Sequence, residues 1–307
     1  MSLAPEYLQY PHRRYGMDHD RYDWSILPQR PPVSWPDGAR VALWVVPALE
    51  FFPLNQKAEP FKAPGGMVTP YPDLRHYTLR DYGNRVGVFR VFKVLDALGI
   101  RASVAINAAV AERYPFLIGE VNRRGWEIIA CGVDMGTLHY GGLAQETEQA
   151  QIRHTLAVLR AAADGPVTGW LSPAKSESLA TPDLVAAEGV DYLCDWINDD
   201  LPYPFRTSAG EIHAMPLSQE MDDQTIMLEK HHTEESFAEQ VIDQFDVLYR
   251  EAERSGGRLM TLTIHPWMSG QPHRIKALET ALTHIMRHDG VWSATGADIL
   301  AAFKAGA

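Results

Sequence analysis

A histidine and a tryptophan stand directly after an apolar run of this sequence, in the stretch IHPWMSGQPHR at 264–274. The run before it, RLMTLT at 258–263, has the length and composition of a buried β-strand. Imidazole can exchange a proton near neutral pH, and indole offers an apolar wall with one N–H donor. His265 and Trp267 are therefore candidates for acid–base chemistry and ligand binding at the end of a strand.

Carboxylates, amides, a hydroxyl, a thiol and a lysine follow the other strand-like runs in the same way. In chain order these residues are Glu50, Asn107, Cys131, Asp134, Ser172, Lys175, Asp195, Trp196, Asn198 and Glu220. Such an inventory suits a site that moves protons and holds a polar ligand. Any single member is more often a turn former or a helix cap, so only the whole set indicates a site.

Familiar nucleophile, metal and phosphate motifs are missing from the sequence. There is no Gly-x-Ser-x-Gly elbow, and Ser172 and Lys175 in WLSPAKSES lack the context of a known serine acylase. Neither His-Glu-x-x-His nor Cys-x-x-Cys occurs. Cys131 could be a nucleophile, but a buried structural thiol is the commoner role. DYGNRVG at 81–87 has neither the spacing nor the preceding strand of a dinucleotide loop.

The elements that must position these residues alternate between two periodicities. Helical spacing links Val88, Phe92 and Leu95, and Thr233 caps a later helix. Strand-like runs lie at 40–49, 101–106, 126–131, 166–171, 190–194, 211–217 and 258–264. Strands that are apolar throughout, separated by amphipathic helices, indicate a parallel sheet covered by helices. About seven such units in roughly 260 residues favour a closed or nearly closed barrel, whose site forms at the carboxyl ends of the strands.

Composition argues against nucleic acid and membrane partners, and it separates an N-terminal arm from a single domain. The 307 residues include 28 Lys and Arg against 39 Asp and Glu, a formal net charge of −11, which argues against nucleic acid or an anionic membrane. There is no apolar run of membrane-spanning length, no signal-peptide core, and only two cysteines, so we expect a cytoplasmic protein. Residues 1–38, rich in Tyr, Arg and Pro, predict an ordered N-terminal arm before a single domain at 39–307.

Several stretches together resemble the polysaccharide deacetylase (NodB-homology) superfamily. They are RDYGNRVGVFRVFKVLDALGIRASVAINAAVAERYP at 80–115, GWLSPAKSES at 169–178, YLCDWINDDLPYPF at 192–205 and IHPWMSGQPHR at 264–274. They look most like the branch of cofactor-independent allantoinases, over roughly residues 25–305. The resemblance implies a distorted (β/α)₇ barrel and hydrolysis of an amide-type C–N bond.

The sequence departs from the superfamily's metal-dependent deacetylases, which carry Asp-Asp after the first strand and His-x-x-x-His after the third. Here Glu50 stands alone in PALEFF, and Cys131 and Met135 replace the paired histidines in ACGVDMGTLHYGG. The arginine of the fourth motif is missing, His265 is kept, and His139 matches a histidine that the branch often keeps further along the loop. A catalytic Zn²⁺ needs about three protein ligands, so we expect no metal or other cofactor, with Zn²⁺ or another divalent cation as the alternative.

Without a metal, a side chain must activate water. We expect Glu50 or Asp134 to act as the base, and His265 to protonate the leaving nitrogen or to polarise the carbonyl. The residues expected to bind substrate are Asn107, Cys131, His139, Trp170, Ser172, Trp196, Asn198 and Trp267. The substrate is predicted to be a small cyclic ureide, imide or amide. Allantoin is one example, although Cys131 and Met135 make the third-strand loop more apolar than in an allantoinase of this branch.

Two other functions stay open on the sequence. One is a metal-dependent carbohydrate or peptidoglycan N-deacetylase, and the other is a non-catalytic relative that binds a small molecule or serves as an assembly subunit. The aromatic arm and the branch resemblance also predict a homo-oligomer, for which a tetramer is one form.

Overall fold

The computed structural model describes residues 19–55 and 72–306. Residues 1–18 of the predicted arm lie outside the described residues. The rest of the arm contains two single 3-10 turns, η2 (Leu27–Gln29) and η3 (Pro36–Gly38). Arg21 and Arg30 tie it to the domain through ion pairs with Asp183 (2.7 Å) and Asp199 (2.6 Å).

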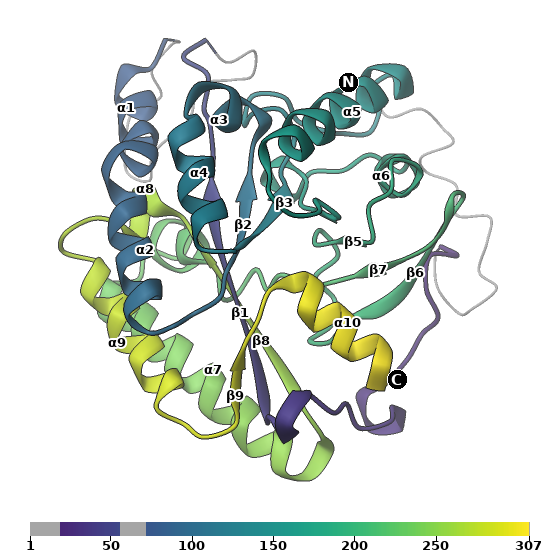
Figure 1. Cartoon of the computed structure of the whole chain (residues 1–307), viewed down its shortest axis with the longest axis vertical. Coiled ribbons are helices and arrows are strands. Elements are labelled where there is room, and N and C mark those ends of the chain that lie inside the picture. The colour runs from purple at the N-terminus through teal and green to yellow at the C-terminus, as the bar shows by residue number, and fades with distance from the viewer. Residues whose placement is uncertain (1–18, 56–71, 307) are drawn as a thin grey trace.

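One curled sheet forms the centre of the described residues (Figure 1), with the strand order β6-β7-β5-β4-β3-β2-β1-β8 and β9 paired to β1. The strands are β1 (Val41–Leu49), β2 (Ser103–Ile106), β3 (Glu127–Ala130), β4 (Gly169–Trp170), β5 (Tyr192–Leu193), β6 (Tyr203–Thr207), β7 (Gly210–Ala214), β8 (Arg258–Ile264) and β9 (Val291–Ser293). All neighbours are parallel except β6 and β7, which form a hairpin. Because β6 and β8 end the order among the described strands, the sheet is a half-barrel, and the predicted distorted (β/α) barrel fold is confirmed.

Helices cover the outer face of this sheet, and α2, α7 and α9 lie along the part formed by β1 and β8 (Figure 1). The helices are α1 (Leu74–Tyr82), α2 (Val88–Ala97), α3 (Ala108–Arg113), α4 (Pro115–Arg123), α5 (Gln145–Ala162), α6 (Thr181–Ala187), α7 (Glu234–Ser255), α8 (Pro266–Ser269), α9 (Ile275–Met286) and α10 (Gly296–Gly306). Short turns are η4 (Gly83–Gly87), η5 (Pro173–Lys175) and η6 (Thr225–Glu229). The predicted cap of α7 is present, because the Thr233 hydroxyl accepts the N–H of Ser236.

Alternating residues of β1 separate two apolar clusters. Leu43 and Val45 point outward and pack with the helices, whereas Trp44 and Val46 face the inside of the half-barrel. Ile299 of α10 joins the inner cluster, and α10 lies across the open side of the curled sheet in Figure 1. The sheet is therefore covered on both faces, which is why its strands are apolar throughout.

The predicted fourth and fifth strands are shorter than their apolar runs. Only Gly169–Trp170 and Tyr192–Leu193 have strand pairing. Gly169 permits this contact, since a Cβ there would lie 2.3 Å from the ring of Tyr192. The polar residues that follow these two strands are thus carried by loops.

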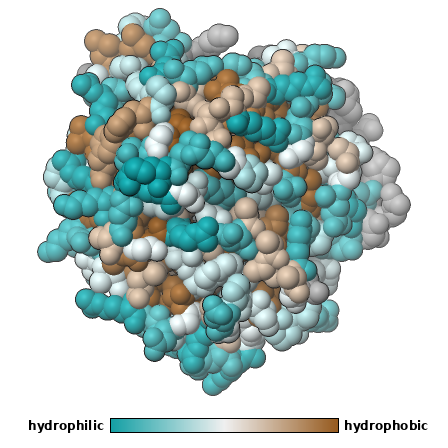
Figure 2. Space-filling model, in the orientation of Figure 1, coloured by the Kyte–Doolittle hydropathy of each residue, from teal (hydrophilic) through white to brown (hydrophobic). Residues whose placement is uncertain are grey.

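The surface is mixed in character. On the face in Figure 2, hydrophobic residues form separate patches among hydrophilic ones. Within residues 19–55 and 72–306, no helix combines the length and the apolar character needed to cross a membrane.

Candidate functional site

His265 and Glu50 meet where β8 and β1 end. The two strands pair in parallel up to Pro47 and Ile264, so the residues that follow them leave the same edge of the sheet. His265 Nε2 lies 3.8 Å from Glu50 Oε1, and their side chains are only 9% and 10% exposed. Parallel pairing thus brings together two of the three residues predicted to be catalytic.

Asp222 and Asp223 complete this group, although neither was among the predicted site residues. Asp222 forms an isolated bridge with Thr263, so its segment runs beside the end of β8. Asp223 is fully buried and accepts the backbone N–H of His265 (2.9 Å) and its Nδ1–H (2.7 Å). The hydroxyl of Ser269 also donates to Asp223. These bonds fix the orientation of the imidazole and turn Nε2 toward Glu50.

The carboxylates around His265 determine the protonation state of its imidazole. Burial lowers the pKa of His265, but Asp222, Glu50 and Asp223 outweigh that effect and raise the pKa to about 10. Burial raises the pKa of Glu50, while His265 and Arg80 oppose the rise. At neutral pH, His265 is therefore an imidazolium that carries a proton on Nε2.

Trp267 and Arg80 form one side of the site. The guanidinium carbon of Arg80 lies 3.5 Å from the centroid of the Trp267 ring, which is a cation–π contact. The rings of Trp267 and His265 are 6.2 Å apart between centroids. Nε1 of Trp267 and Oε2 of Glu50 are buried polar atoms without a hydrogen-bond partner among the described residues. Such atoms are ready to accept and donate bonds to a ligand or to water.

Lys175 reaches the same edge from η5. Its φ is +53° and that of Ala174 is +56°, an unfavourable left-handed conformation for both residues. The ammonium donates to the carbonyl oxygen of Leu217 (3.1 Å) and to Oε1 of Gln219 (3.0 Å). Burial lowers the pKa of Lys175, and Asp222 and Asp195 oppose that shift. The lysine therefore places a cation beside the acidic group.

A second pair of carboxyl groups, Glu177 and Asp195, follows β4 and β5. Asp195 Oδ1 accepts the N–H of Ser172 (2.8 Å), and Glu177 Oε2 accepts Nε1–H of Trp196 (2.9 Å). Burial and the neighbouring Asp195 raise the pKa of Glu177 to about 10. Because two adjacent buried carboxylates repel each other, Glu177 stays protonated at neutral pH.

Three further predicted residues lie at strand ends but are engaged with the protein's own groups. Asn107 accepts the N–H of Phe51 (2.8 Å) and donates to the carbonyl of Cys131. Ser172 accepts Nε1–H of Trp170 (2.9 Å). Burial, together with Glu50 and Asp195, raises the pKa of the Cys131 thiol well above its usual value, so the thiol stays protonated. These side chains shape the loops of the site.

Asp134 and His139 do not join Glu50 and His265. Asp134 accepts the N–H of Gly136 (2.9 Å) and so closes a turn of the third-strand loop. His139 is fully buried, and its Nδ1 lies 3.1 Å from Glu148 of α5. Of the two predicted bases, Glu50 alone adjoins the histidine.

Two of the predicted tryptophans and Asn198 also face other parts of the molecule. Trp170 belongs to the cluster between the sheet and the helices, and its ring lies 5.8 Å from that of His139. Trp196 packs on Phe205 of β6 (4.9 Å between ring centroids). Asn198 is exposed, bonds to the hydroxyls of Tyr22 and Tyr203, and lines a cavity of about 450 Å³ under the arm. Trp267 is the tryptophan that lies beside His265.

The chain is similar in sequence and fold to known proteins. No family model matches the chain. It is 24% identical over 300 residues to a provisionally named polysaccharide deacetylase of Schizosaccharomyces pombe, covering 88% of this chain and 92% of the relative. The crystal structure of Puue allantoinase superposes with a TM-score of 0.83 and 25% identity, over 92% of this chain and 98% of that chain. The chain thus resembles the polysaccharide deacetylase superfamily in both sequence and fold.

The proteins that are similar to this chain differ in the activity that their names give. A Pseudomonas aeruginosa structure, also provisionally named as a polysaccharide deacetylase, superposes with a TM-score of 0.77 and 25% identity. It covers 90% of this chain and 95% of its own. The similar proteins thus carry the names of both an allantoinase and deacetylases, and they support a polysaccharide deacetylase-like hydrolase without fixing its substrate.

The expectation that this deacetylase-like protein has no metal or cofactor is wrong. The deacetylases of the superfamily that it resembles depend on a metal, and Asp222, Asp223 and His265 each offer one ligand atom, all within 4.8 Å of one another. Two carboxylates and an imidazole suit a divalent cation, and Glu50 adds a buried oxygen without a partner among the described residues. The residues present therefore fit a metal ion. The absence of a metal was wrongly predicted because ligands were expected only at the motif positions after the first and third strands, and Asp222 and Asp223 lie elsewhere in the chain.

A weak signal for the missed residues was present in the sequence. Asp222 and Asp223 are two adjacent acids between the apolar Met221 and Ile226, shortly after the predicted strand at 211–217. Adjacent acids in an apolar context are rarely buried unless they are paired. Their partner, however, lies 42 residues further along the chain, so the pattern alone could not reveal it.

Proposed function

We propose that this protein hydrolyses a non-peptide C–N bond in a small cyclic amide, such as a ureide or an imide. Glu50 acts as the base toward water, and His265 acts as the acid toward the leaving nitrogen. The observation that carries this proposal is the line of contacts from Asp223 through His265 to Glu50, with 2.7 Å at Nδ1 and 3.8 Å at Nε2.

The raised pKa of His265 favours these roles over the reverse assignment. An imidazolium has no lone pair, so it cannot take a proton from water, but it can donate one from Nε2. Glu50 takes a proton from water while the water oxygen bonds to the carbonyl carbon. The C–N bond then breaks, and the nitrogen takes the Nε2 proton of His265. The cycle closes when Glu50 has lost its proton and His265 has regained one.

The surrounding side chains suit a compact amide. Nε1–H of Trp267 faces the side of Glu50 and can donate to a carbonyl oxygen, while its ring offers a flat apolar surface. Lys175 supplies a cation toward a second carbonyl or a developing oxyanion. A ring amide or ureide has two such carbonyl edges on a flat face, so it could use both donors.

A divalent cation held by Asp222, Asp223 and His265 would polarise a carbonyl or lower the pKa of water. A ligating nitrogen needs its lone pair, so a cation on His265 would replace the Nδ1 proton that Asp223 accepts, and the proton on Nε2 would stay.

The candidate metal ligands also favour a second function, removal of an acetyl group from an amino sugar. An acetamide is less activated than a strained ring amide, so it depends more on a Lewis acid. The names of the deacetylase neighbours support including it as an alternative substrate class.

The test is a turnover screen of the purified protein against allantoin, hydantoins, cyclic imides and acetylated amino-sugar oligomers. We expect ring opening of a cyclic amide, lower turnover after chelation, and recovery on addition of a divalent cation. His265→Ala should lower kcat by about 100-fold or more. His273→Ala is the matched control, because His273 is exposed before α9, and it should keep the wild-type rate.

If the protein turns over acetylated amino sugars and no cyclic amide, the second function, deacetylation, replaces the first. Lack of turnover of every compound, or a near-native rate in His265→Ala, would overturn the proposed mechanism.

A further inference from the structure

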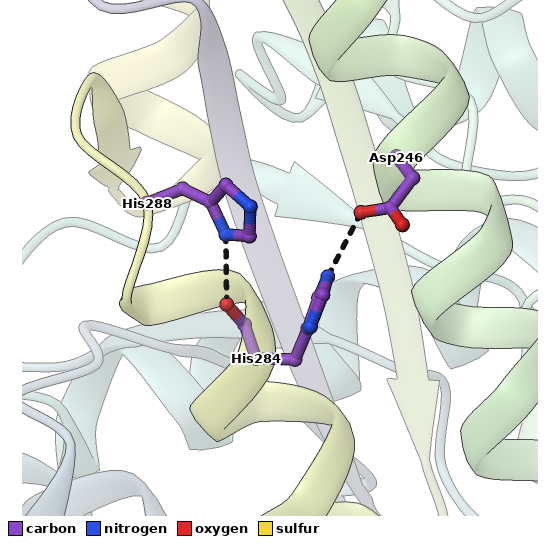
Figure 3. Close-up of side chains that lie close together, drawn as sticks. All are labelled: Asp246, His284 and His288. Atoms are coloured by element: carbon purple, nitrogen blue, oxygen red, sulfur yellow. Dashed lines mark hydrogen bonds and ion pairs between the residues drawn. The ribbon is translucent and has the colours of Figure 1, made fainter.

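A second group of potential metal ligands lies on the outer helices, away from the site of Glu50 and His265. Asp246 belongs to α7, His284 to the last turn of α9, and His288 to the turn that follows it. Each residue offers one ligand atom, and these atoms lie within 4.8 Å of one another. Figure 3 shows the imidazole of His284 directed at the Asp246 carboxylate, with the ring of His288 beside it.

The hydrogen bond of His288 holds its imidazole in a form that can bind a metal. His288 Nδ1 donates to the carbonyl oxygen of His284 (2.9 Å), which leaves the lone pair on Nε2. A backbone carbonyl at the second ring nitrogen is a typical support for a metal-binding histidine. His284 Nε2 donates to Asp246 Oδ1 (2.8 Å), and a cation bound between them would take the place of this proton.

Aromatic packing restricts the positions of the two rings. Phe245, next to Asp246 on α7, contacts the rings of His284 (5.9 Å between centroids) and His288 (4.9 Å). Tyr249, one turn further along α7, contacts His288 (5.1 Å). Its hydroxyl donates to the carbonyl oxygen of Asp289 (2.8 Å), which fixes the turn carrying His288. The two histidine rings are therefore supported by aromatic neighbours on α7.

This group lies at the end of β1 opposite Glu50 and His265. Gly290, two residues after His288, accepts the N–H of Arg40 (2.7 Å) immediately before β1 begins. Glu50 follows the other end of β1, whose nine residues span about 30 Å. A cation at Asp246 would therefore be too distant to take part in the reaction at Glu50.

We propose that Asp246, His284 and His288 form a binding site for a borderline divalent cation of the Zn²⁺ class. Two imidazoles and one carboxylate suit Zn²⁺, Cu²⁺ or Ni²⁺ better than Ca²⁺ or Mg²⁺, which prefer oxygen ligands. The side chains of Asp246 and His284 are 45% and 34% exposed, so a solvent molecule can complete the coordination. The bound ion joins α7 to α9 and stabilises the helical layer over β1 and β8.

The proposal is tested by Zn²⁺ binding to the full chain, prepared without a histidine tag. Binding is measured by equilibrium dialysis with elemental analysis, and stability by thermal unfolding with and without Zn²⁺. We compare the wild type with His284→Ala/His288→Ala and with the milder Asp246→Asn. His154→Ala is the matched control, since His154 and Glu112 (3.3 Å) form an exposed pair without a third ligand in the described residues.

We expect the double variant to bind one Zn²⁺ fewer per chain than the wild type and to lose the rise in Tm that Zn²⁺ gives. Asp246→Asn should weaken this binding step by at least about tenfold, as expected when a ligand of a metal site is changed. His154→Ala should match the wild type in both measurements. The group of Asp222, Asp223 and His265 is present in every variant, so the difference in Zn²⁺ binding reports on Asp246, His284 and His288.

Equal Zn²⁺ stoichiometry and an equal Tm shift in the wild type and the double variant would overturn the proposal. If the double variant does not fold, Asp246→Asn decides in the same way, because its side chain is half-exposed and its loss leaves both rings packed. Unchanged affinity in Asp246→Asn then also overturns it.

Discussion

At the scale of the residue, the imidazole of His265 acquires its properties from three carboxylates. An ordinary histidine has a pKa of about 6.5 and can serve as acid or base at neutral pH. Burial alone would lower that pKa, but Asp222, Glu50 and Asp223 raise it to about 10. This raised pKa agrees with the roles proposed above, with His265 as the proton donor and Glu50 as the acceptor.

Removal of the Glu50 carboxylate should therefore abolish most of the turnover. In Glu50→Gln the amide cannot accept a proton from water, so we expect kcat to fall by about 100- to 10,000-fold with a smaller change in KM. Initial rates on the substrate identified by the screen measure the effect. Glu220→Gln is the control, since Glu220 is 70% exposed and pairs with Lys230, and it should be nearly neutral. A rate near the wild type in Glu50→Gln would show that another group activates water.

At the scale of the element, two glycines allow η4 to press against α8. A Cβ at Gly87 would lie 2.0 Å from the carbonyl oxygen of Pro266, and one at Gly83 would lie 2.8 Å from the N of Trp267. Both glycines have ordinary helical backbones, so close approach explains their presence. The stretch DYGNRVG at 81–87 does not have the pattern of a dinucleotide-binding loop. Its two glycines instead position the segment that carries Trp267.

Gly87→Ala should push α8 away and displace the residues that follow His265. We expect a loss of about 1–3 kcal/mol in the free energy of unfolding, from overpacking, together with a lower kcat. Urea denaturation and initial rates measure the two effects. Gly119→Ala in α4 is the matched control, because no atom lies within 4 Å of the position that its Cβ would take, and it should be neutral or stabilising. Equal stability of the two alanine variants would contradict the close contact.

At the scale of the whole molecule, the two ends of the described chain cover the same part of the domain. Trp35 of the arm is buried and donates Nε1–H to the carbonyl oxygen of Arg258 (2.8 Å), at the start of β8. Trp35 and Ile299 of α10 both belong to the inner cluster. These contacts cover the half-barrel at the end opposite Glu50 and His265.

The buried His213 of β7 should make the stability of the folded chain depend on pH. Burial, with a contribution from Lys304 of α10, lowers its pKa to about 4, against about 6.5 in an unfolded chain. The unfolded state therefore binds more protons between these values. The stabilisation by neutral His213 is complete above pH 6.5 and is lost as the pH falls toward 4.

We expect the urea midpoint of the wild type to fall between about pH 6.5 and pH 4 more steeply than that of His213→Gln. The glutamine keeps a polar group of similar length but does not titrate in this range. Urea titrations at several pH values measure the difference. Parallel curves for the two proteins would show that His213 does not contribute to acid destabilisation.

Much of the architecture could be predicted because it depends on local pattern. Apolar runs identified the main parallel strands, Thr233 identified the start of α7, and strand ends located Glu50 and His265. These features follow from side-chain periodicity and from the common direction of parallel strands, both of which are encoded over a few residues.

Only the tertiary structure decided which strand-end residues meet. The register of the Asp222 segment beside β8 brings Asp223 to a histidine 42 residues away, and this contact supplies both the proton on His265 and the candidate metal ligands. In the same way, the packing of β4 turns Trp170 toward the helices, away from the predicted site. A sequence specifies the faces of its own elements, but distances between elements depend on how the whole chain packs. For that reason the sequence by itself determined the barrel and the edge of the candidate site, and the folded chain determined which side chains meet at that edge.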